Sequence, residues 1–133
     1  EGRLSSCGTA AEDEEGEEDE DDDEDDDEEV EYPGLLGHGE GVLQLKTPTR
    51  LPSLLGGERA IGVAASGLFS LALSADGAVW SWGCGPGTGH GDVEDQWQPK
   101  KIDALAGQRV VAASAAFAHS FALTAGGSVW SWG

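Results

Sequence analysis

The stretch Val79-Trp80-Ser81-Trp82-Gly83 returns fifty positions later as Val129-Trp130-Ser131-Trp132-Gly133. Two tryptophans within five residues are rarely repeated by chance, so we interpret the two stretches as one structural unit that occurs twice. In an extended strand, successive side chains point to opposite faces. The two tryptophans of each copy therefore share one face, and the serine and its flanking valine share the other. The stretch predicts a repeated β-strand with an aromatic face.

Two more strand-like segments precede each copy. Residues 59–66 and 109–116 begin with arginine and continue mainly in small residues, which suit a strand that is crowded against other backbone. Residues 69–74 and 119–124 alternate larger apolar residues with small ones, which is the period of a strand. Both pairs of segments therefore predict further β-strands in each repeat.

The turns and the proline-bearing segments complete the repeat. Asp76-Gly77 and Gly126-Gly127 predict two-residue hairpin turns of type I′, in which both central residues have positive φ. Residues 48–54 and 99–105 each begin with proline, which lacks an amide donor, and they predict edge strands. Each unit thus offers four short strands in about 50 residues, which is typical of a β-propeller blade. The apolar spacing of two disfavours a helical solenoid.

Two glycine-rich loops, at residues 33–39 and 86–91, each contain the sequence Gly-His-Gly. Their histidines, His38 and His90, suggest a metal site, but no carboxylate or thiol stands at a fixed ligand spacing from both. No nucleophile or orienting acid repeats beside His119, and no glycine-rich loop opens a helix as nucleotide-binding loops do. The residues therefore predict no metal, no cofactor and no catalytic residue, and we do not expect an enzyme.

The net charge of −19 comes from one segment of the chain. Residues 12–31 are aspartate or glutamate at every position except Gly16 and Val30, which accounts for 18 of the 26 acidic residues. Adjacent carboxylates repel each other, and no apolar surface offsets the lost chain entropy, so residues 1–31 are expected to be disordered. The segment is then either a solvating tail or linker, or a docking arm for basic partners such as histones.

The rest of the composition limits the possible partners and compartment. The seven lysines and arginines are too few and too dispersed for a nucleic-acid footprint. No apolar run approaches the roughly 20 residues of a membrane-spanning helix. Nothing in the positions of the two cysteines suggests a disulfide framework, so we expect reduced thiols in a nuclear or cytoplasmic protein. Because the sequence has no methionine, we expect a piece of a longer chain that lacks its true N-terminus.

These motifs, and the order in which they follow one another, resemble the regulator of chromosome condensation repeat. The order is Gly-Leu-Leu-Gly-His-Gly, Pro-x-x-Leu, Val-Ala-Ala-Ser-x-x-x-Ser-Leu-Ala-Leu and Asp-Gly-x-Val-Trp-Ser-Trp-Gly, with about two copies over residues 33–133. Phe69 stands where the family usually has histidine. The resemblance implies an all-β fold, a partial β-propeller with two four-stranded blade-like repeats of a seven-bladed ring. The repeats would span residues 32–83 and 84–133, after the disordered segment 1–31.

The resemblance also implies a function in protein recognition. The leading hypothesis is a protein-interaction scaffold that is a monomeric propeller in the full-length protein. An exposed tryptophan in a loop is a reasonable contact point for a protein partner. The predicted contact residues lie in the loop over residues 92–98 and are Asp92, Glu94, Asp95 and Trp97. Two alternatives stay open: guanine nucleotide exchange on a small nuclear GTPase, as the founding family member performs, and substrate recruitment to a ubiquitin ligase.

Overall fold

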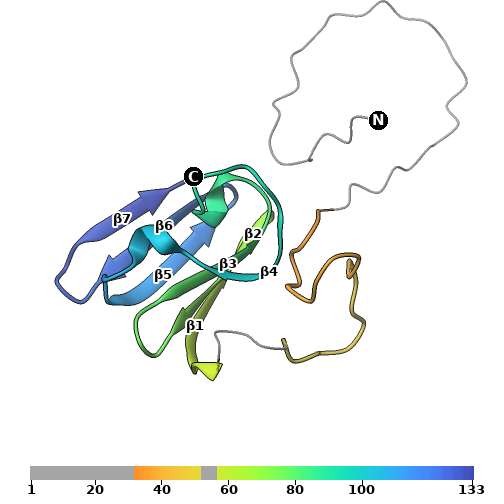
Figure 1. The fold of residues 1–133 in the computed structure, drawn as a ribbon, viewed down its shortest axis with the longest axis horizontal. Helices are drawn as coiled ribbons and strands as arrows, with labels where there is room; N and C mark the ends of the chain where they lie inside the picture. Colours follow the sequence, from red (N-terminus) through yellow and green to blue (C-terminus); the bar gives the residue numbers. More distant parts are fainter. Residues whose placement is uncertain (1–31, 52–56) are drawn as a thin grey trace, which may run out of the picture.

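The computed structural model describes residues 32–51 and 57–133, and the predicted disordered segment, residues 1–31, lies outside them. The described chain forms two antiparallel β-sheets that pack against each other (Figure 1). The first sheet has the strand order β1-β2-β3-β4, and the second has the order β5-β6-β7. The prediction of an all-β fold built from blade-like sheets is confirmed.

The elements are short and follow one another closely along the chain. The first sheet consists of β1 (Ala60–Ala65), β2 (Phe69–Ser74), β3 (Val79–Gly83) and β4 (Gln96–Lys101). The second sheet consists of β5 (Val110–Ala116), β6 (His119–Thr124) and β7 (Val129–Trp132). Two single-turn 3-10 helices, η2 (Pro86–Thr88) and η3 (Asp103–Leu105), flank β4 in the sequence. Within residues 32–51 and 57–133, no helix has the length and apolarity to cross a membrane.

The strands pair in the same register in both sheets. Leu71 faces Ser81 across β2 and β3, and Phe121 faces Ser131 across β6 and β7. The first strand of each sheet carries an irregularity near its start, which lies between Ala60 and Gly62 in β1 and at the corresponding position in β5. The repeat in the sequence is therefore also a repeat of backbone pairing.

The hairpin turns differ from the predicted type. Gly77 and Gly127 have positive φ values of 89° and 86°, but Asp76 does not have a positive φ. Gly77 donates its N–H to Ser74 O at 3.0 Å, and the Ser74 N–H donates to Ala78 O at 2.9 Å. These bonds close a three-residue loop, in which a type I turn is followed by one left-handed glycine. The type I′ prediction was wrong because this longer loop needs only one left-handed residue.

The proline-bearing segment of the second repeat belongs to the first sheet. Residues 99–101 of this segment end β4, which pairs with β3 so that Trp80 lies opposite Lys101, whereas residues 103–105 form η3 and not a strand. β4 is an edge strand, as predicted, and the second sheet has three strands. The corresponding part of the first repeat, residues 48–51, is not in a strand. The domain boundaries 32–83 and 84–133 follow the sequence repeat and stay predictions, since the first sheet itself continues beyond residue 83.

Apolar side chains from both sheets form the main core between them. Leu71, Leu73 and Val79 from the first sheet are at most 4% exposed. Val110 and Ala122 from the second sheet are each 1% exposed and belong to the same cluster. This packing holds the two sheets at a fixed distance, and their loops therefore have fixed positions at the two ends of the strands.

A smaller cluster lies on the opposite face of the first sheet. It contains Ala72 and Trp82, with Leu51 and Trp80 packed against them. Both tryptophans of β3 thus lie on one face, whereas Val79 lies in the core on the other face. The predicted aromatic face is confirmed.

Candidate partner-binding site

The glycine-rich loop that contains η2 connects the two sheets. The carbonyl oxygen of Gly87 accepts hydrogen bonds from Ser120 Oγ at 3.2 Å and from Trp132 Nε1 at 2.8 Å. Trp132 is half-buried and packs against the core cluster between the sheets. Its indole therefore contributes to the packing between the two sheets.

The loop over residues 33–39 makes the same contacts with the first sheet. The carbonyl oxygen of Leu35 accepts hydrogen bonds from Ser70 Oγ at 3.2 Å and from Trp82 Nε1 at 2.9 Å. Sequence reasoning missed this contact, although the serine does recur fifty positions later as Ser120. The sequence could not reveal the carbonyl oxygen of Leu35 as the acceptor, because every residue has a backbone carbonyl group and no residue type marks this one.

His90 links the loop that contains η2 to β3. Ser81 Oγ donates to Thr88 O at 2.5 Å, so His90 Nε2, 2.7 Å from that hydroxyl, is the donor to it. Ser81 is fully buried and its proton is committed to a carbonyl, so this pair is not a nucleophile with its base. Burial lowers the pKa of His90, and the charge of Lys100 lowers it further. In residues 32–51 and 57–133, no three potential metal-ligating side chains form a group.

The acidic residues of the predicted contact site directly follow this histidine. Asp92 Oδ1 accepts the backbone N–H of Glu94 at 3.1 Å, which forms a tight turn with Asp92, Val93 and Glu94 exposed. Asp95 is half-buried, and burial raises the pKa of its carboxyl group. The structure therefore keeps the carboxyl groups of Asp92, Glu94 and Asp95 on one short segment at the start of β4.

Trp97 lies in β4, so its predicted place in a loop was wrong. It is half-buried, and its carbonyl oxygen accepts the backbone N–H of Gly39 at 3.0 Å. The strand begins at Gln96, which pairs with Gly83, and this long-range pairing was not visible in the local sequence. Because β4 fixes its backbone, Trp97 is held beside the acidic turn rather than on a free loop.

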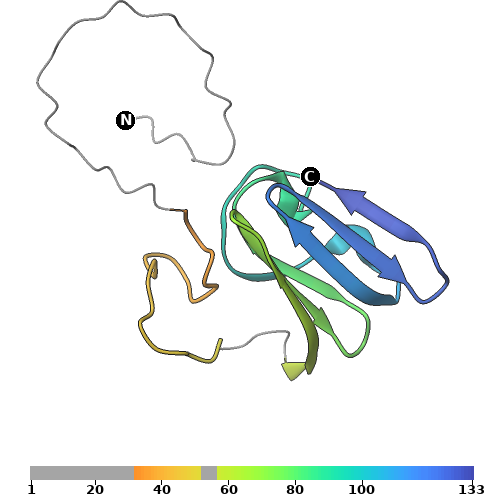
Figure 2. The same cartoon turned by 180° about the vertical axis from the view of Figure 1, so that it is seen from behind.

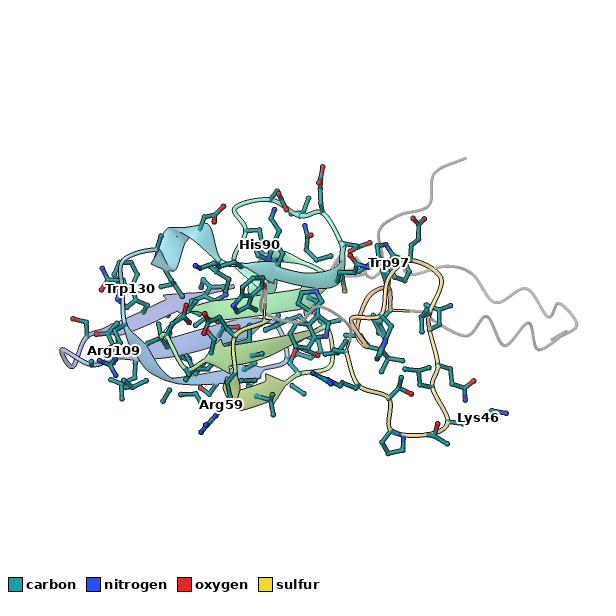
Figure 3. All side chains as sticks on the ribbon, turned by 60° about the horizontal axis from the view of Figure 1, so that its bottom comes forward. Lys46, Arg59, His90, Trp97, Arg109 and Trp130 are labelled. Atoms are coloured by element: carbon teal, nitrogen blue, oxygen red, sulfur yellow. The ribbon has the colours of Figure 1, made fainter. Side chains whose placement is uncertain are left out.

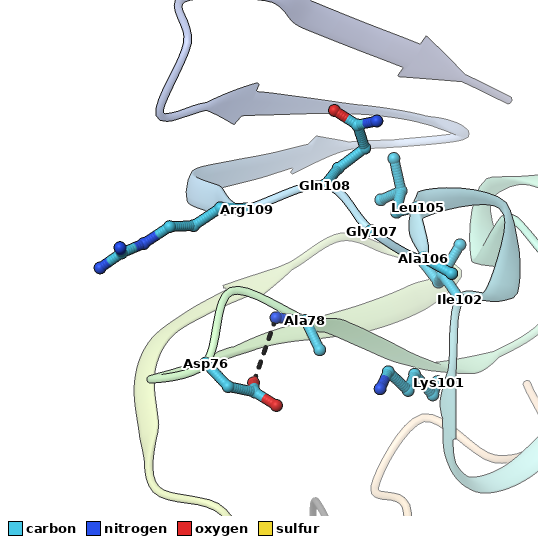
Figure 4. Close-up of a pocket in the computed structure, with 9 residues that line it drawn as sticks. All are labelled: Asp76, Ala78, Lys101, Ile102, Leu105, Ala106, Gly107, Gln108 and Arg109. Atoms are coloured by element: carbon cyan, nitrogen blue, oxygen red, sulfur yellow. Dashed lines mark hydrogen bonds between the residues drawn. The ribbon is translucent and has the colours of Figure 1, made fainter.

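A cleft of about 270 Å³ lies at the other end of β4 (Figure 4). Its charged lining residues are Asp76, Lys101 and Arg109. The hydroxyl of Ser74 and the N–H of Ala78 donate to the Asp76 carboxylate, and these hydrogen bonds lower the pKa of Asp76. The sequence did not predict this cleft, because its walls come from a hairpin turn, a strand end and the η3–β5 connection, which meet only in the folded chain.

The acidic turn and the cleft occupy opposite ends of the sheets. Figure 3 shows Trp97 and Arg109 far apart, at the two ends of the sheets. This separation follows from the antiparallel pairing, because consecutive connections alternate between the two ends of the strands. The end with Trp97 combines carboxylates and an aromatic ring, which can bind a cationic partner through charge and packing.

Comparison with known proteins agrees with this architecture. Two models of the Regulator of chromosome condensation (RCC1) repeat match residues 60–86 and 76–123. The chain is a member of this repeat family. The Regulator of chromosome condensation of Xenopus laevis is 37% identical over 71 residues, which are 52% of this chain and 16% of that protein. The human E3 ubiquitin-protein ligase HERC2 is 39% identical over 77 residues, or 54% of this chain and 2% of that protein.

Solved structures of RCC1-repeat proteins share the fold. Yeast RCC1 (Prp20) bound to Kap60 gives a TM-score of 0.66 at 25% identity, over 77% of this chain and 26% of that chain. Prp20p of Saccharomyces cerevisiae, a structure described together with binding to Gsp1p and histones, gives 0.61 at 26% identity, over 75% and 26%. Human WBSCR16 gives 0.56 at 30% identity, over 58% and 20%.

These likenesses identify the two sheets as RCC1-type propeller blades. The chain spans only 16% and 2% of the two curated relatives and at most 26% of the solved chains. What the whole relatives do is therefore not carried over to this chain by similarity alone.

Proposed function

We propose that this chain is a protein-interaction module that binds a basic protein segment through its acidic turn and Trp97. The observation that carries the proposal is the arrangement at the start of β4. Asp92 and Glu94 are exposed there, while Asp95 and Trp97 are half-buried. Lysine and arginine side chains pair with carboxylates and stack on indole rings, so one basic segment can use both features.

Two further facts support a basic nuclear partner such as a histone. The structure of the relative Prp20p was described with its binding to histones. The acidic residues 12–31, which lie outside the described residues, would add a long-range attraction for the same class of partner. The proposal therefore places the protein in the nucleus.

The test measures binding of purified core histones to the complete chain by fluorescence anisotropy. Trp97→Ala and the triple variant Asp92→Asn/Glu94→Gln/Asp95→Asn should each weaken binding about tenfold or more, because an aromatic anchor or three charges are lost. Neither change should lower the melting temperature by more than a few degrees, since none of the four side chains is fully buried.

The control removes the same kind of charge from the opposite end of the sheets. Glu58 and Asp103 are exposed and lie at the end that carries Arg109. The Glu58→Gln/Asp103→Asn variant should bind histones as the unchanged chain does. Equal weakening by this control and by the triple variant would mean that overall charge alone attracts the histone, and the acidic turn would no longer be the site.

Guanine nucleotide exchange is the second candidate function, and the description of Prp20p with Gsp1p is the observation that favours it. Exchange needs surface loops that stabilise the nucleotide-free GTPase, and no catalytic side chain is required. The full-length protein should then accelerate release of fluorescent GDP from a small nuclear GTPase. An unchanged release rate would remove this candidate.

Substrate recruitment to a ubiquitin ligase is the third candidate, and similarity to HERC2 favours it. A partner captured by the acidic turn would then be ubiquitinated in the presence of the full-length protein. If the captured partner is not ubiquitinated by full-length protein supplied with ubiquitin and its activating and conjugating enzymes, this candidate is removed.

A further inference from the structure

The cleft shown in Figure 4 is built from backbone that both sheets hold in place. The Ile102 N–H donates to Val79 O at 2.9 Å, which fixes the end of β4. A Cβ on Gly77 would lie 3.0 Å from Arg109 Cα, so the turn between β2 and β3 closely contacts the start of β5. Lys101 and Arg109 are therefore presented from two fixed walls. The cleft belongs to the contact between the two sheets, where both neighbours are present.

The lining of the cleft carries two positive charges and one negative charge. Within residues 32–51 and 57–133, neither the Lys101 ammonium group nor the Arg109 guanidinium group forms an ion pair. The Asp76 carboxylate also lines the cleft, but it accepts hydrogen bonds from the Ser74 hydroxyl and the Ala78 N–H. Asp76 thus stabilises its own turn, and the lining keeps one positive charge in excess. A ligand with carboxylate groups complements such a site.

The size of the cleft favours the side chains of a peptide over a small molecule. Its volume is about 270 Å³, which is below the roughly 300–1,000 Å³ of small-molecule pockets. Ile102 and Leu105 line it but are only 3% and 5% exposed, so they offer little apolar surface to a ligand. Gln108 is exposed beside them, and its amide can both donate to and accept from a peptide backbone. These features fit an extended acidic segment.

The chain itself contains an acidic segment that is long enough to reach the cleft. Residues 12–31 contain 18 carboxylates and join the described chain at residue 32. The described chain begins at the other end of β4, where Gly34 packs so closely on Gln96 that it has no room for a Cβ. The six residues of β4 span roughly 20 Å, whereas twenty extended residues reach roughly 66 Å. Attachment to the same chain gives the segment an effective concentration on the order of millimolar.

We infer that carboxylates of residues 12–31 occupy this cleft and pair with Lys101 and Arg109. The opposite end of the sheets does not compete, because the exposed carboxylates of Asp92 and Glu94 repel the segment. A single exposed ion pair is weak, but 18 carboxylates offer many equivalent pairings within one tethered segment. The docked segment is withheld from basic partners until such a partner displaces it. The inference does not rest on histone binding by the acidic turn, so either can fail alone.

The first test measures the reactivity of Lys101 in the 133-residue chain. An amino group paired with a carboxylate reacts more slowly with an acetylating reagent, because pairing favours its protonated form. In a comparison variant, every aspartate and glutamate of residues 12–31 is replaced by its amide. Mass spectrometry should find Lys101 acetylated roughly threefold faster in this variant than in the unchanged chain. Lys46 is exposed and lies far from Arg109 in Figure 3, so it should react at the same rate in both chains.

The two lysines together decide the outcome of this test. Equal rates at Lys101 in the two chains would overturn the inference. An equal change at Lys46 would also overturn it, since positive charge in general, and not the cleft, would then attract the segment. A synthetic peptide of residues 12–31, added to the amide variant at millimolar concentration, should slow the acetylation of Lys101 again. Failure of the peptide to do so would contradict docking in the cleft.

A second test observes the segment instead of the cleft. Lys101→Gln/Arg109→Gln removes both cations, and Lys46→Gln/Arg50→Gln removes the same charge outside the cleft. All four side chains are exposed, so both variants should retain their melting temperature within a few degrees. A protease that cleaves after glutamate should cut residues 12–31 about twofold faster in the first variant than in the second. Equal cutting rates in the two folded variants would show that Lys101 and Arg109 do not hold the segment.

Discussion

Two glycines with nearly the same backbone conformation have different surroundings. Gly89 has a φ of +79°, and a Cβ at this position would lie 2.8 Å from Trp132 Nε1. Gly107 has a φ of +80°, and a Cβ there would meet nothing within 4 Å. Gly37 repeats the first situation, with Trp82 Nε1 at 3.0 Å. At positions 37 and 89, glycine therefore provides both the left-handed backbone and the space for an indole.

Comparing two alanine substitutions should separate these two effects. Gly107→Ala should cost about 1–2 kcal/mol in the free energy of unfolding, since only left-handed strain is added. Gly89→Ala should cost about 1–3 kcal/mol more, because its methyl group displaces the Trp132 indole. Urea unfolding followed by tryptophan fluorescence measures both values. Equal costs would show that the indole moves aside freely and that the loop does not depend on this contact.

Secondary-structure elements differ in how far the sequence determines them. The alternating residues predicted strands at 69–74 and 119–124, and the structure has strands with the same bounds. The turn type was not predictable in this way, because Asp-Gly and Gly-Gly fit more than one turn. The place of β4 was also missed, since it depends on pairing across a connection of twelve residues between Gly83 and Gln96.

The candidate site shows the same limit. Asp92, Glu94 and Asp95 could be grouped from the sequence because they are neighbours in it. The cleft with Asp76, Lys101 and Arg109 could not, because a hairpin turn, a strand end and the η3–β5 connection form it together. Local composition thus revealed the acidic turn, and tertiary contacts alone revealed the opposite end of the sheets.

The loop that contains η2 should make stability depend on pH. Burial lowers the pKa of His90 in the folded state below its usual value of 6.5, and the charge of Lys100 lowers it further, against the opposing influence of Ser81, Asp92 and Asp103. The unfolded chain therefore binds a proton at higher pH than the folded chain does. Stability is fully present above about pH 6.5 and decreases as the pH falls below that value.

Replacing this histidine should flatten the pH dependence near and below pH 6.5. His90→Gln keeps an N–H donor for Ser81 but cannot be protonated. The melting temperature of this variant should change less between about pH 5.5 and 7 than that of the unchanged chain. His119→Gln, at an exposed position, serves as the matched control. A pH dependence that persists fully in His90→Gln would assign it to other groups.

At the scale of the whole molecule, partner binding and folding stability depend on different forces. The acidic turn attracts partners through charge, together with the 18 carboxylates of residues 12–31. Charge attraction is screened over a Debye length that falls from about 14 Å to about 4 Å between 0.05 M and 0.5 M salt. Apolar burial is not screened in this way and is strengthened by excluded salts.

Salt should therefore separate histone binding from folding stability in one preparation. Raising sodium chloride from about 0.05 M to about 0.5 M should weaken histone binding about tenfold or more. The same change should leave the melting temperature within a few degrees, since burial of apolar side chains between the two sheets stabilises the fold. Anisotropy and circular dichroism measure the two quantities on the same samples. Histone binding that did not weaken with salt would contradict attraction of the histone by the acidic turn.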